Sequence, residues 1–158
     1  ARNDRMDLIL QKAVELGVNN IQPLWMQRSQ AHLKGSRLEK RCKHWQGIII
    51  SACEQCGRAT LPQLGAAMNY ADWMHSRNNR GLRLLLQPDS TTGLGTLQPP
   101  DDRIFVLAGP EGGLSTDEQM LAQSAGFLGI RLGPRILRTE TAALAALAAM
   151  QTLWGDFS

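Results

Sequence analysis

Short apolar runs alternate with helical patterns in the second half of the chain, and this alternation constrains the fold more than any other feature. Residues 82–87, 104–108 and 127–132 are largely apolar runs of strand length, and glycine and proline follow each of them. An alanine-rich helical pattern covers residues 141–154, after the third run. Strands that alternate with helices predict an α/β domain with a mostly parallel sheet flanked by helices.

The first half of the chain is dominated by helical patterns. Apolar residues at helical spacing predict a helix over residues 4–16, which Gly17 ends. Residues 21–25 are a short strand candidate, and a central proline places this strand at a sheet edge or ends it early. Asn69 is in position to cap a short helix that runs to His75.

Two sequence signatures mark helix starts. Ser36 stands three residues before Glu39, which is the spacing of a capping box. Ser115 and Glu118 repeat this spacing in the second half. The first box predicts a long amphipathic helix that ends at Gly57, and the second predicts a shorter helix.

The length and composition are those of one globular domain. Apolar residues make up 43% and charged residues 20% of the 158 positions, which argues against a disordered chain. No apolar run approaches the roughly 18 residues that a membrane helix requires. The start of the chain is polar and leads directly into a helical pattern, so it does not resemble a signal peptide. We therefore expect a single cytoplasmic domain over residues 1–158 with no membrane partner.

Basic residues gather between residues 28 and 58. Seven basic residues stand there against two acidic ones, in a chain with a net charge of +3. Most cations of the chain are arginine, which suits phosphate and stacked bases better than lysine does. The pattern is compatible with an RNA partner, and it is equally typical of a solvated helix face. The side chains predicted to contact RNA are Arg28, Lys34, Arg37 and Arg58.

Three cysteines cannot all pair with one another. Cys53 and Cys56 form a single C-x-x-C pair, with no second pair and no downstream histidine pair. A zinc site needs more ligands than this spacing supplies. The two thiols are therefore interpreted as reduced side chains in or beside the core, in preference to a metal or redox pair, and no metal site is predicted.

Three loops follow the predicted strands, at the edge of a parallel sheet where ligands usually bind. They start at Gln87, Gly109 and Gly133, and the last two are rich in glycine and proline. Glycine lets backbone groups approach a ligand closely, which suits a flat group such as adenine. The loop at Gly109 is neither a Walker loop nor a dinucleotide fingerprint, and Glu111 would repel a phosphate there. Tight turns without a ligand explain the same glycines equally well.

Four segments, in order along the chain, carry a more specific signal. Leu-Ala-Gly-Pro-Glu-Gly-Gly-Leu-Ser at residues 107–115 precedes Leu-Gly-Pro-Arg-Ile-Leu-Arg-Thr-Glu-Thr-Ala at residues 132–142. Residues 4–17 and the stretch Ala-Cys-Glu-Gln-Cys-Gly-Arg at residues 52–58 stand upstream. Together these segments resemble the RsmE family of SPOUT (α/β-knot) methyltransferases, which make N3-methyluridine in 16S ribosomal RNA.

The resemblance implies a fold, a cofactor and partners. It implies a C-terminal trefoil knot, in which the last helix threads through the preceding loop, and a homodimer with each cofactor site near the subunit interface. The implied cofactor is S-adenosylmethionine, with S-adenosylhomocysteine as the product. The implied substrate is one uridine of 16S ribosomal RNA in the small ribosomal subunit.

The chain departs from the family in two respects. Family members usually carry a β-rich, PUA-like RNA-binding domain before the segment that matches Asp4, and this chain starts where that domain would end. Gln27 stands where the family more often has glutamate. The resemblance therefore extends to the catalytic domain, and selective RNA binding by the chain alone does not follow from it.

The signature segments and the loop after the first predicted strand also supply the candidate site residues. Arg138 is predicted to hold a phosphate or a developing oxyanion, and Glu140 or Glu111 to accept the proton on uridine N3. Structural ion pairs and helix capping are the competing interpretations of these three side chains. The residues predicted to hold the cofactor are Leu86, Gln87, Pro88, Leu107, Ala108, Gly109, Pro110, Glu111, Gly112, Gly113, Leu132, Gly133, Pro134, Ile136, Leu137, Arg138, Thr141 and Ala142.

Two other functions compete with the methyltransferase hypothesis. A nucleotide or phosphate-ester enzyme would use the loop at Gly109, and it would prefer ATP to S-adenosylmethionine. A non-catalytic RNA-binding or assembly module would keep the fold and bind RNA, but would show no affinity for the cofactor.

Overall fold

The computed structural model describes residues 3–29, 32–76 and 80–157 of the chain. Within these ranges, helices alternate with short strands. The helices are α1 (Asn3–Glu15), α2 (Gly35–Cys56), α3 (Tyr70–His75), the 3-10 helix η1 (Leu94–Thr96), α4 (Thr116–Ser124) and α5 (Thr139–Trp154). The strands are β1 (Asn20–Ile21), β2 (Leu24–Trp25), β3 (Gln63–Leu64), β4 (Met68–Asn69), β5 (Leu82–Leu86), β6 (Ile104–Leu107) and β7 (Leu128–Ile130).

Three parallel strands form the sheet that was predicted for the second half of the chain. β5 lies in the middle, and Leu84 is in register with Val106 of β6 and with Leu128 of β7. Successive side chains of a strand point to opposite faces of the sheet. Leu84 accordingly packs with Ala146 of α5, whereas Leu85 packs in a cluster with residues of α3 and α4. The predicted α/β class with a mostly parallel sheet between helices is confirmed.

The first half of the chain holds two smaller parallel pairs of strands. The predicted strand over residues 21–25 is divided at Pro23, because β1 pairs with β3 while β2 pairs with β4. Pro23 has no amide to donate, so only its carbonyl oxygen serves the ladder, accepting from the Met68 amide at 3.3 Å. β3 and β4 were not predicted, because strands of two residues are too short to show a periodic apolar pattern.

Helix boundaries follow the predicted local signals with one correction. The Ser115 hydroxyl accepts from the Glu118 amide and the Glu118 carboxylate accepts from the Ser115 amide, as the second capping box predicts. Gly57 ends α2 in the left-handed conformation, at φ 77°. The capping box predicted at Ser36 is wrong. α2 begins before Ser36 and its N-cap is Lys34, so the Ser36 backbone is already helical and its hydroxyl cannot serve as the cap.

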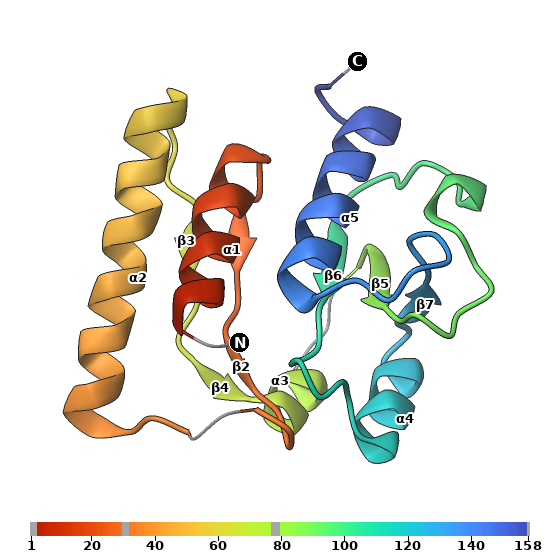
Figure 1. Ribbon diagram of the computed structural model, residues 1–158, viewed down its shortest axis with the longest axis horizontal. Coiled ribbons are helices and arrows are strands. Elements are labelled where there is room, and N and C mark those ends of the chain that lie inside the picture. The colour runs from red at the N-terminus through yellow and green to blue at the C-terminus, as the bar shows by residue number, and fades with distance from the viewer. Residues whose placement is uncertain (1–2, 30–31, 77–79, 158) are drawn as a thin grey trace.

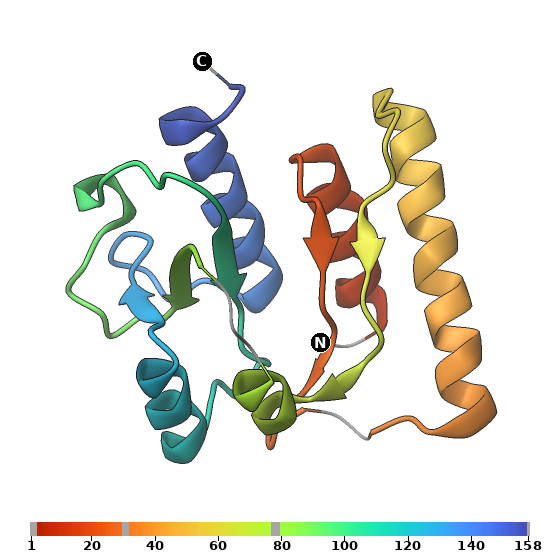
Figure 2. The same ribbon diagram turned by 180° about the vertical axis from the view of Figure 1, so that it is seen from behind.

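α1, α2 and α5 run side by side on one face of the strands (Figure 1), and the opposite view brings the strands to the front (Figure 2). Leu10 and Val14 of α1 pack against Ile49 of α2, and all three side chains are fully buried. α1 also lies against α5. The first helix is thereby placed beside the last one.

The connection from β5 to β6 reaches across β7 and α5 before it returns to the sheet. The amide of Arg131 donates to the carbonyl of Thr92 at 2.8 Å, and the Ser90 hydroxyl donates to the carbonyl of Gly129 at 2.6 Å. Farther along, Leu94 of η1 is buried in the cluster that α5 covers. The connection therefore contacts β7 and α5, the two elements that the chain links at its C-terminal end. The implied trefoil knot stays a prediction.

The cysteines are free thiols in different surroundings: Cys53 is buried, Cys42 is partly buried and Cys56 is exposed. Among the described residues, no group of His, Cys, Asp and Glu side chains is arranged to hold a metal ion. No helix in the described part of the chain is long and apolar enough to cross a membrane.

Candidate ligand-binding site

A cavity of about 290 Å³ opens beyond the carboxyl ends of β5, β6 and β7. Its lining comes from the three loops that leave these strands, together with the start of α5. Parallel sheets usually bind their ligands at this edge. The volume lies near the lower end of the range of about 300–1,000 Å³ that is typical of small-molecule sites.

Twelve of the eighteen residues that were predicted to hold a cofactor line this cavity. They are Leu86, Gln87, Pro88, Ala108, Gly109, Pro110, Glu111, Gly113, Leu132, Ile136, Leu137 and Ala142. The other six lie outside the lining, and they are Leu107, Gly112, Gly133, Pro134, Arg138 and Thr141. Leu107 is buried in the core of the sheet, and the remaining five are exposed.

Further residues line the cavity without having been predicted to do so. They are Leu85, Asp89, Leu114, Gln119, Ile130, Arg131, Arg135 and Thr139. Arg131 and Arg135 lie in or beside the second signature segment, so their charge and position were available as a signal. Gln119 carried no such signal, because only the fold turns this residue of α4 toward the strand ends.

The lining combines apolar with charged side chains. Leu86, Leu132 and Leu137 are partly buried within it, while Arg135 brings a positive charge. Ile136 also lines the cavity and is 87% exposed, which is unusual for a large apolar side chain. Such a side chain is available to pack against a ligand that enters.

Two glycines determine the shape of the loop between β6 and α4. A Cβ atom on Gly109 would collide with the buried side chain of Leu114. Gly113 has a φ of 70°, a left-handed conformation that other residues rarely adopt, and its amide donates to the carbonyl of Pro110 at 2.8 Å. Both glycines are therefore required by the tight turn itself, as one of the two interpretations of the sequence holds. The cavity lies beside this turn.

The two predicted catalytic carboxylates meet at an arginine of α1. Glu111 lines the cavity, and its Oε1 lies 3.2 Å from Nη1 of Arg5. Glu140 lies outside the lining, with its Oε1 3.7 Å from Nε of the same arginine. Arg138 is the exposed N-cap residue of α5, and its side chain makes no capping bond. Arg5 was not predicted as a site residue, because it stands 106 residues before Glu111.

The residues that were predicted to contact RNA lie in three different surroundings. Arg28 lines the cavity, and its Nη1 donates to the carbonyl of Gly112 at 2.7 Å. Nη1 of Arg58 donates to the carbonyl of Val14 in the last turn of α1 at 2.9 Å and to that of Val18 just after α1 at 2.8 Å, so this guanidinium already stabilises the fold. Lys34 and Arg37 are exposed at the start of α2. Contact of these four side chains with RNA stays a prediction.

A buried carboxylate fastens the segment after β2 to α4. Oε1 of Glu118 accepts from the Gln27 amide at 2.7 Å, and Oε2 accepts from the Ser115 amide at 2.8 Å. The hydroxyl of Tyr70 donates to the Glu118 carbonyl at 2.8 Å. Burial, with the charge of Glu118 as a smaller cause, raises the pKa of Tyr70 above its ordinary value. Gln27 is thereby held in place through its backbone, and with it the neighbouring Arg28.

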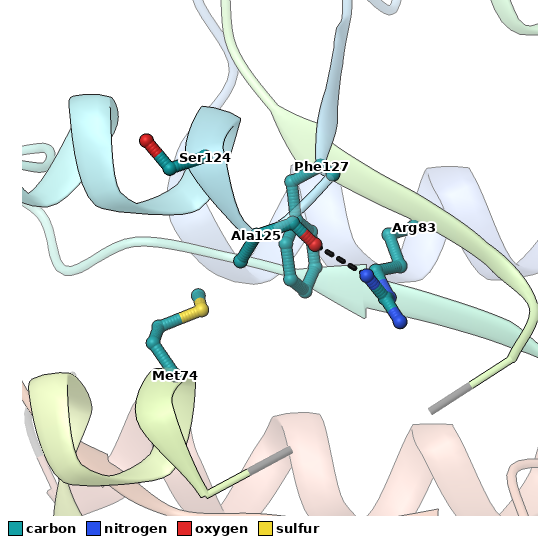
Figure 3. A pocket seen from close by; sticks show the side chains of 6 residues that line it. Met74, Arg83, Ser124, Ala125 and Phe127 are labelled. Atoms are coloured by element: carbon teal, nitrogen blue, oxygen red, sulfur yellow. Dashed lines mark hydrogen bonds between the residues drawn. The ribbon is translucent and has the colours of Figure 1, made fainter. Parts of the chain in front are cut away.

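A second cavity, of about 340 Å³, lies at the opposite end of the sheet, where β5 and β7 begin (Figure 3). Arg83 donates there to the carbonyl of Ala125 just after α4, and Met74 and Phe127 supply apolar walls. None of the predicted site residues lines this cavity. We interpret Arg83 as a structural side chain that provides a hydrogen bond to a free carbonyl at the end of α4. The cavity beyond the carboxyl ends of the strands is therefore the candidate site.

The fold and the cavity together define a class of protein: a parallel α/β domain with a candidate ligand site in the loops, two of them rich in glycine, beyond three adjacent strands. The family model described as RNA methyltransferase domain matches residues 1–151. The chain therefore belongs to this family of RNA methyltransferase domains.

Individual relatives show which members of this family the chain is similar to. A crystal structure of ribosomal RNA small subunit methyltransferase E from Neisseria gonorrhoeae, bound to S-adenosyl methionine, is 46% identical with a TM-score of 0.91, over 98% of this chain and 63% of that one. Ribosomal RNA small subunit methyltransferase E from Buchnera aphidicola of Acyrthosiphon pisum is 38% identical over 157 residues, covering 99% of this chain and 62% of the relative. The protein of the same name from Buchnera aphidicola of Schizaphis graminum is 37% identical over 158 residues, covering 100% and 64%. The predicted resemblance to the RsmE family is thus confirmed, and the chain spans somewhat less than two thirds of the length of these relatives.

Proposed function

We propose that the chain is the catalytic domain of an S-adenosylmethionine-dependent enzyme that methylates N3 of a uridine in 16S ribosomal RNA. The observation that carries this proposal is the convergence of three strand-end loops on one cavity, two of them being the signature segments. The names of the relatives support methyl transfer to ribosomal RNA of the small subunit, and the choice of uridine N3 follows from the resemblance to the RsmE family. The cofactor in the Neisseria structure supports the choice of methyl donor.

The residues of the cavity fit S-adenosylmethionine. Leu86, Leu132 and Leu137 offer apolar surface to a flat adenine, and the glycine-rich loop brings backbone groups close enough to bind its edges. Gly113 lines the cavity, and a Cβ atom there would meet no other atom within 4 Å. The cofactor, when bound, supplies a methyl group on a positively charged sulfur.

Methylation at N3 requires that the uracil imide lose its proton while N3 is held in line with the methyl donor. The carboxylates that line the cavity are Glu111 and Asp89, and we assign the proton to Glu111, because Arg5 fixes its position. Glu140 is held outside the lining, so we assign it no contact with the substrate.

Two arginines of the second signature segment carry positive charge that complements this proton transfer. Arg135 lines the cavity and Arg138 stands at the start of α5. Either guanidinium is suited to a uracil oxygen on which negative charge develops, or to an RNA phosphate beside the target base. Holding both reactants in one cavity accounts for most of the expected rate gain.

The proposal includes the setting in which the enzyme works. The names of the relatives support ribosomal RNA of the small subunit as the substrate. We propose that the enzyme meets this RNA in the small ribosomal subunit, in the cytoplasm. We also propose a homodimer. Leu153 near the end of α5 and Phe157 beyond it are about half exposed, at 48% and 53%, and a second copy would cover such apolar surface.

Methyl transfer tests the proposal directly. The chain is incubated with S-adenosylmethionine labelled in its methyl group and with small ribosomal subunits that lack the modification, and the RNA nucleosides are then identified by mass spectrometry. We expect labelled N3-methyluridine, and Glu111→Gln should slow its formation about 10²–10⁴-fold, which is the range for losing a general base. A chain that binds the cofactor and RNA but labels no nucleoside would instead be a non-catalytic module.

A further inference from the structure

The loop of residues 109–113 is held from two sides by arginines of the first half of the chain. Arg5 reaches Glu111 from α1 at 3.2 Å, and Arg28 reaches the Gly112 carbonyl from the segment after β2 at 2.7 Å. The loop itself contains three glycines, so its own backbone restrains its conformation only weakly. The two contacts therefore supply restraint that the loop sequence lacks.

We infer that Arg5 is a positioning residue of the candidate site, which fixes the loop of residues 109–113 by holding Glu111 and is itself anchored by Glu140. This inference rests on the proposed function, because the cavity that the loop lines is the proposed S-adenosylmethionine site. Arg5 does not line the cavity, so it acts on a ligand through Glu111.

The shape of the guanidinium group explains why an arginine suits this role. Nη1 of Arg5 faces Glu111 while Nε faces Glu140, so two nitrogens of one rigid group contact the loop after β6 and the first turn of α5. The side chains of Arg5 and Glu111 are 30% and 32% exposed, so each contact is partly screened by water. Lysine carries the same charge on a single nitrogen, and it cannot reproduce this fork.

Glu140 has the surroundings of an anchor for Arg5. Its side chain is 13% exposed, and its Oε2 is buried without a hydrogen-bond partner among the described residues. A carboxylate in such a place needs a nearby cation, and within the described part of the chain Glu140 contacts Arg5. Glu140 thus holds Arg5 near the start of α5, and Arg5 ties the loop after β6 to that same point.

Loss of Arg5 would release the loop after β6 from the start of α5. The two signature segments would then move independently, and a ligand would have to order them on binding. We therefore expect weaker cofactor binding without the loss of any atom that lines the cavity.

The test compares Arg5→Met with Lys12→Met, which removes another ion pair of α1, the one between Lys12 and Glu15 at 2.8 Å. Calorimetric titration with S-adenosylmethionine should show binding about tenfold weaker for Arg5→Met, a change of about 1.4 kcal/mol, and unchanged for Lys12→Met. Combining Arg5→Met with Glu111→Gln should weaken binding no further than Glu111→Gln alone, because Arg5 acts through Glu111. Arg5→Lys should restore only part of the affinity. Effects of Arg5→Met and Glu111→Gln that simply add would overturn the inference.

A second readout needs no cofactor. The Gly113 amide donates to the Pro110 carbonyl at 2.8 Å, so its hydrogen exchange reports whether the turn is held. Exchange at Gly113, measured relative to the core amide of Leu85, should be faster in Arg5→Met than in Lys12→Met. Equal exchange in the two variants would overturn the inference. Failure of the unsubstituted chain to bind S-adenosylmethionine would remove the proposed function, and the exchange rates would still decide whether Arg5 holds the loop.

Discussion

Gly113 carries the strictest backbone requirement in the candidate site. Its φ of 70° is left-handed, yet a Cβ atom there would meet nothing within 4 Å, so a substitution is penalised by conformation alone. Gly113→Ala should lower the free energy of unfolding by about 1–2 kcal/mol, which urea denaturation measures. Gly95→Ala is the matched control, because its Cβ also meets open space while its φ is not left-handed. Equal losses in both variants would show that the left-handed conformation is not the cause.

Tyr70 gives a pH-dependent prediction at the same scale. Burial raises the pKa of Tyr70, with Glu118 as the smaller cause, so the folded state disfavours the tyrosinate. The contribution of the neutral Tyr70 hydroxyl to the free energy of unfolding is fully present below the ordinary tyrosine pKa of about 10. It is lost as the pH rises from there through the higher pKa of the folded state. Tyr70 is the single tyrosine of the chain, so absorbance of tyrosinate reports this residue alone.

The native chain should therefore show no tyrosinate at a pH at which the urea-unfolded chain is already ionised. Tyr70→Phe should remove this part of the alkaline loss of stability, and should cost about 1 kcal/mol at neutral pH for the hydrogen bond to Glu118. Ionisation of the native chain near pH 10 with the fold intact would contradict the burial of the hydroxyl.

At the scale of elements, α4 depends on the carboxylate of Glu118, which accepts one amide from its own helix start and one from Gln27. Glu118→Gln replaces one accepting oxygen by a donor and leaves a buried amide unpaired. We expect a loss of about 1–3 kcal/mol in the free energy of unfolding, measured by urea denaturation. Asp117→Asn, in the same helical turn but exposed, should cost less than about 1 kcal/mol, because only its interaction with the helix dipole is reduced. Similar losses in the two variants would argue against the role of Glu118 as a link to the segment after β2.

Elements with a strong local signal were predictable from the sequence. β5, β6 and the box at Ser115 follow from apolar runs and from cap spacing, and they appear close to the expected residues. The strand pairs of the first half were not predictable, because β3 and β4 have two residues each and are formed by tertiary pairing alone. The box at Ser36 failed because the same spacing occurs by chance inside a helix, and the local sequence does not distinguish the two cases.

At the scale of the whole molecule, the candidate site is assembled from both halves of the chain. The loops beyond the strands were predictable, since the rule for parallel sheets places them together. The contacts of Arg5 with Glu111 and of Arg28 with Gly112 were not, because no local pattern links residues that far apart. The resemblance to the RsmE family pointed to the loops, whereas the arginines that hold them became visible only in the folded chain.

The central claim is that the cavity beyond the strand ends binds S-adenosylmethionine, and calorimetric titration of two matched variants tests it most directly. Ala142→Leu adds bulk to this cavity, and Ser124→Leu adds the same kind of bulk to the cavity at the other end of the sheet. We predict saturable binding to the unsubstituted chain, equal binding to Ser124→Leu, and binding at least about tenfold weaker to Ala142→Leu, equivalent to about 1.4 kcal/mol. No binding by the folded chain, or binding that Ser124→Leu weakens and Ala142→Leu does not, would contradict the account.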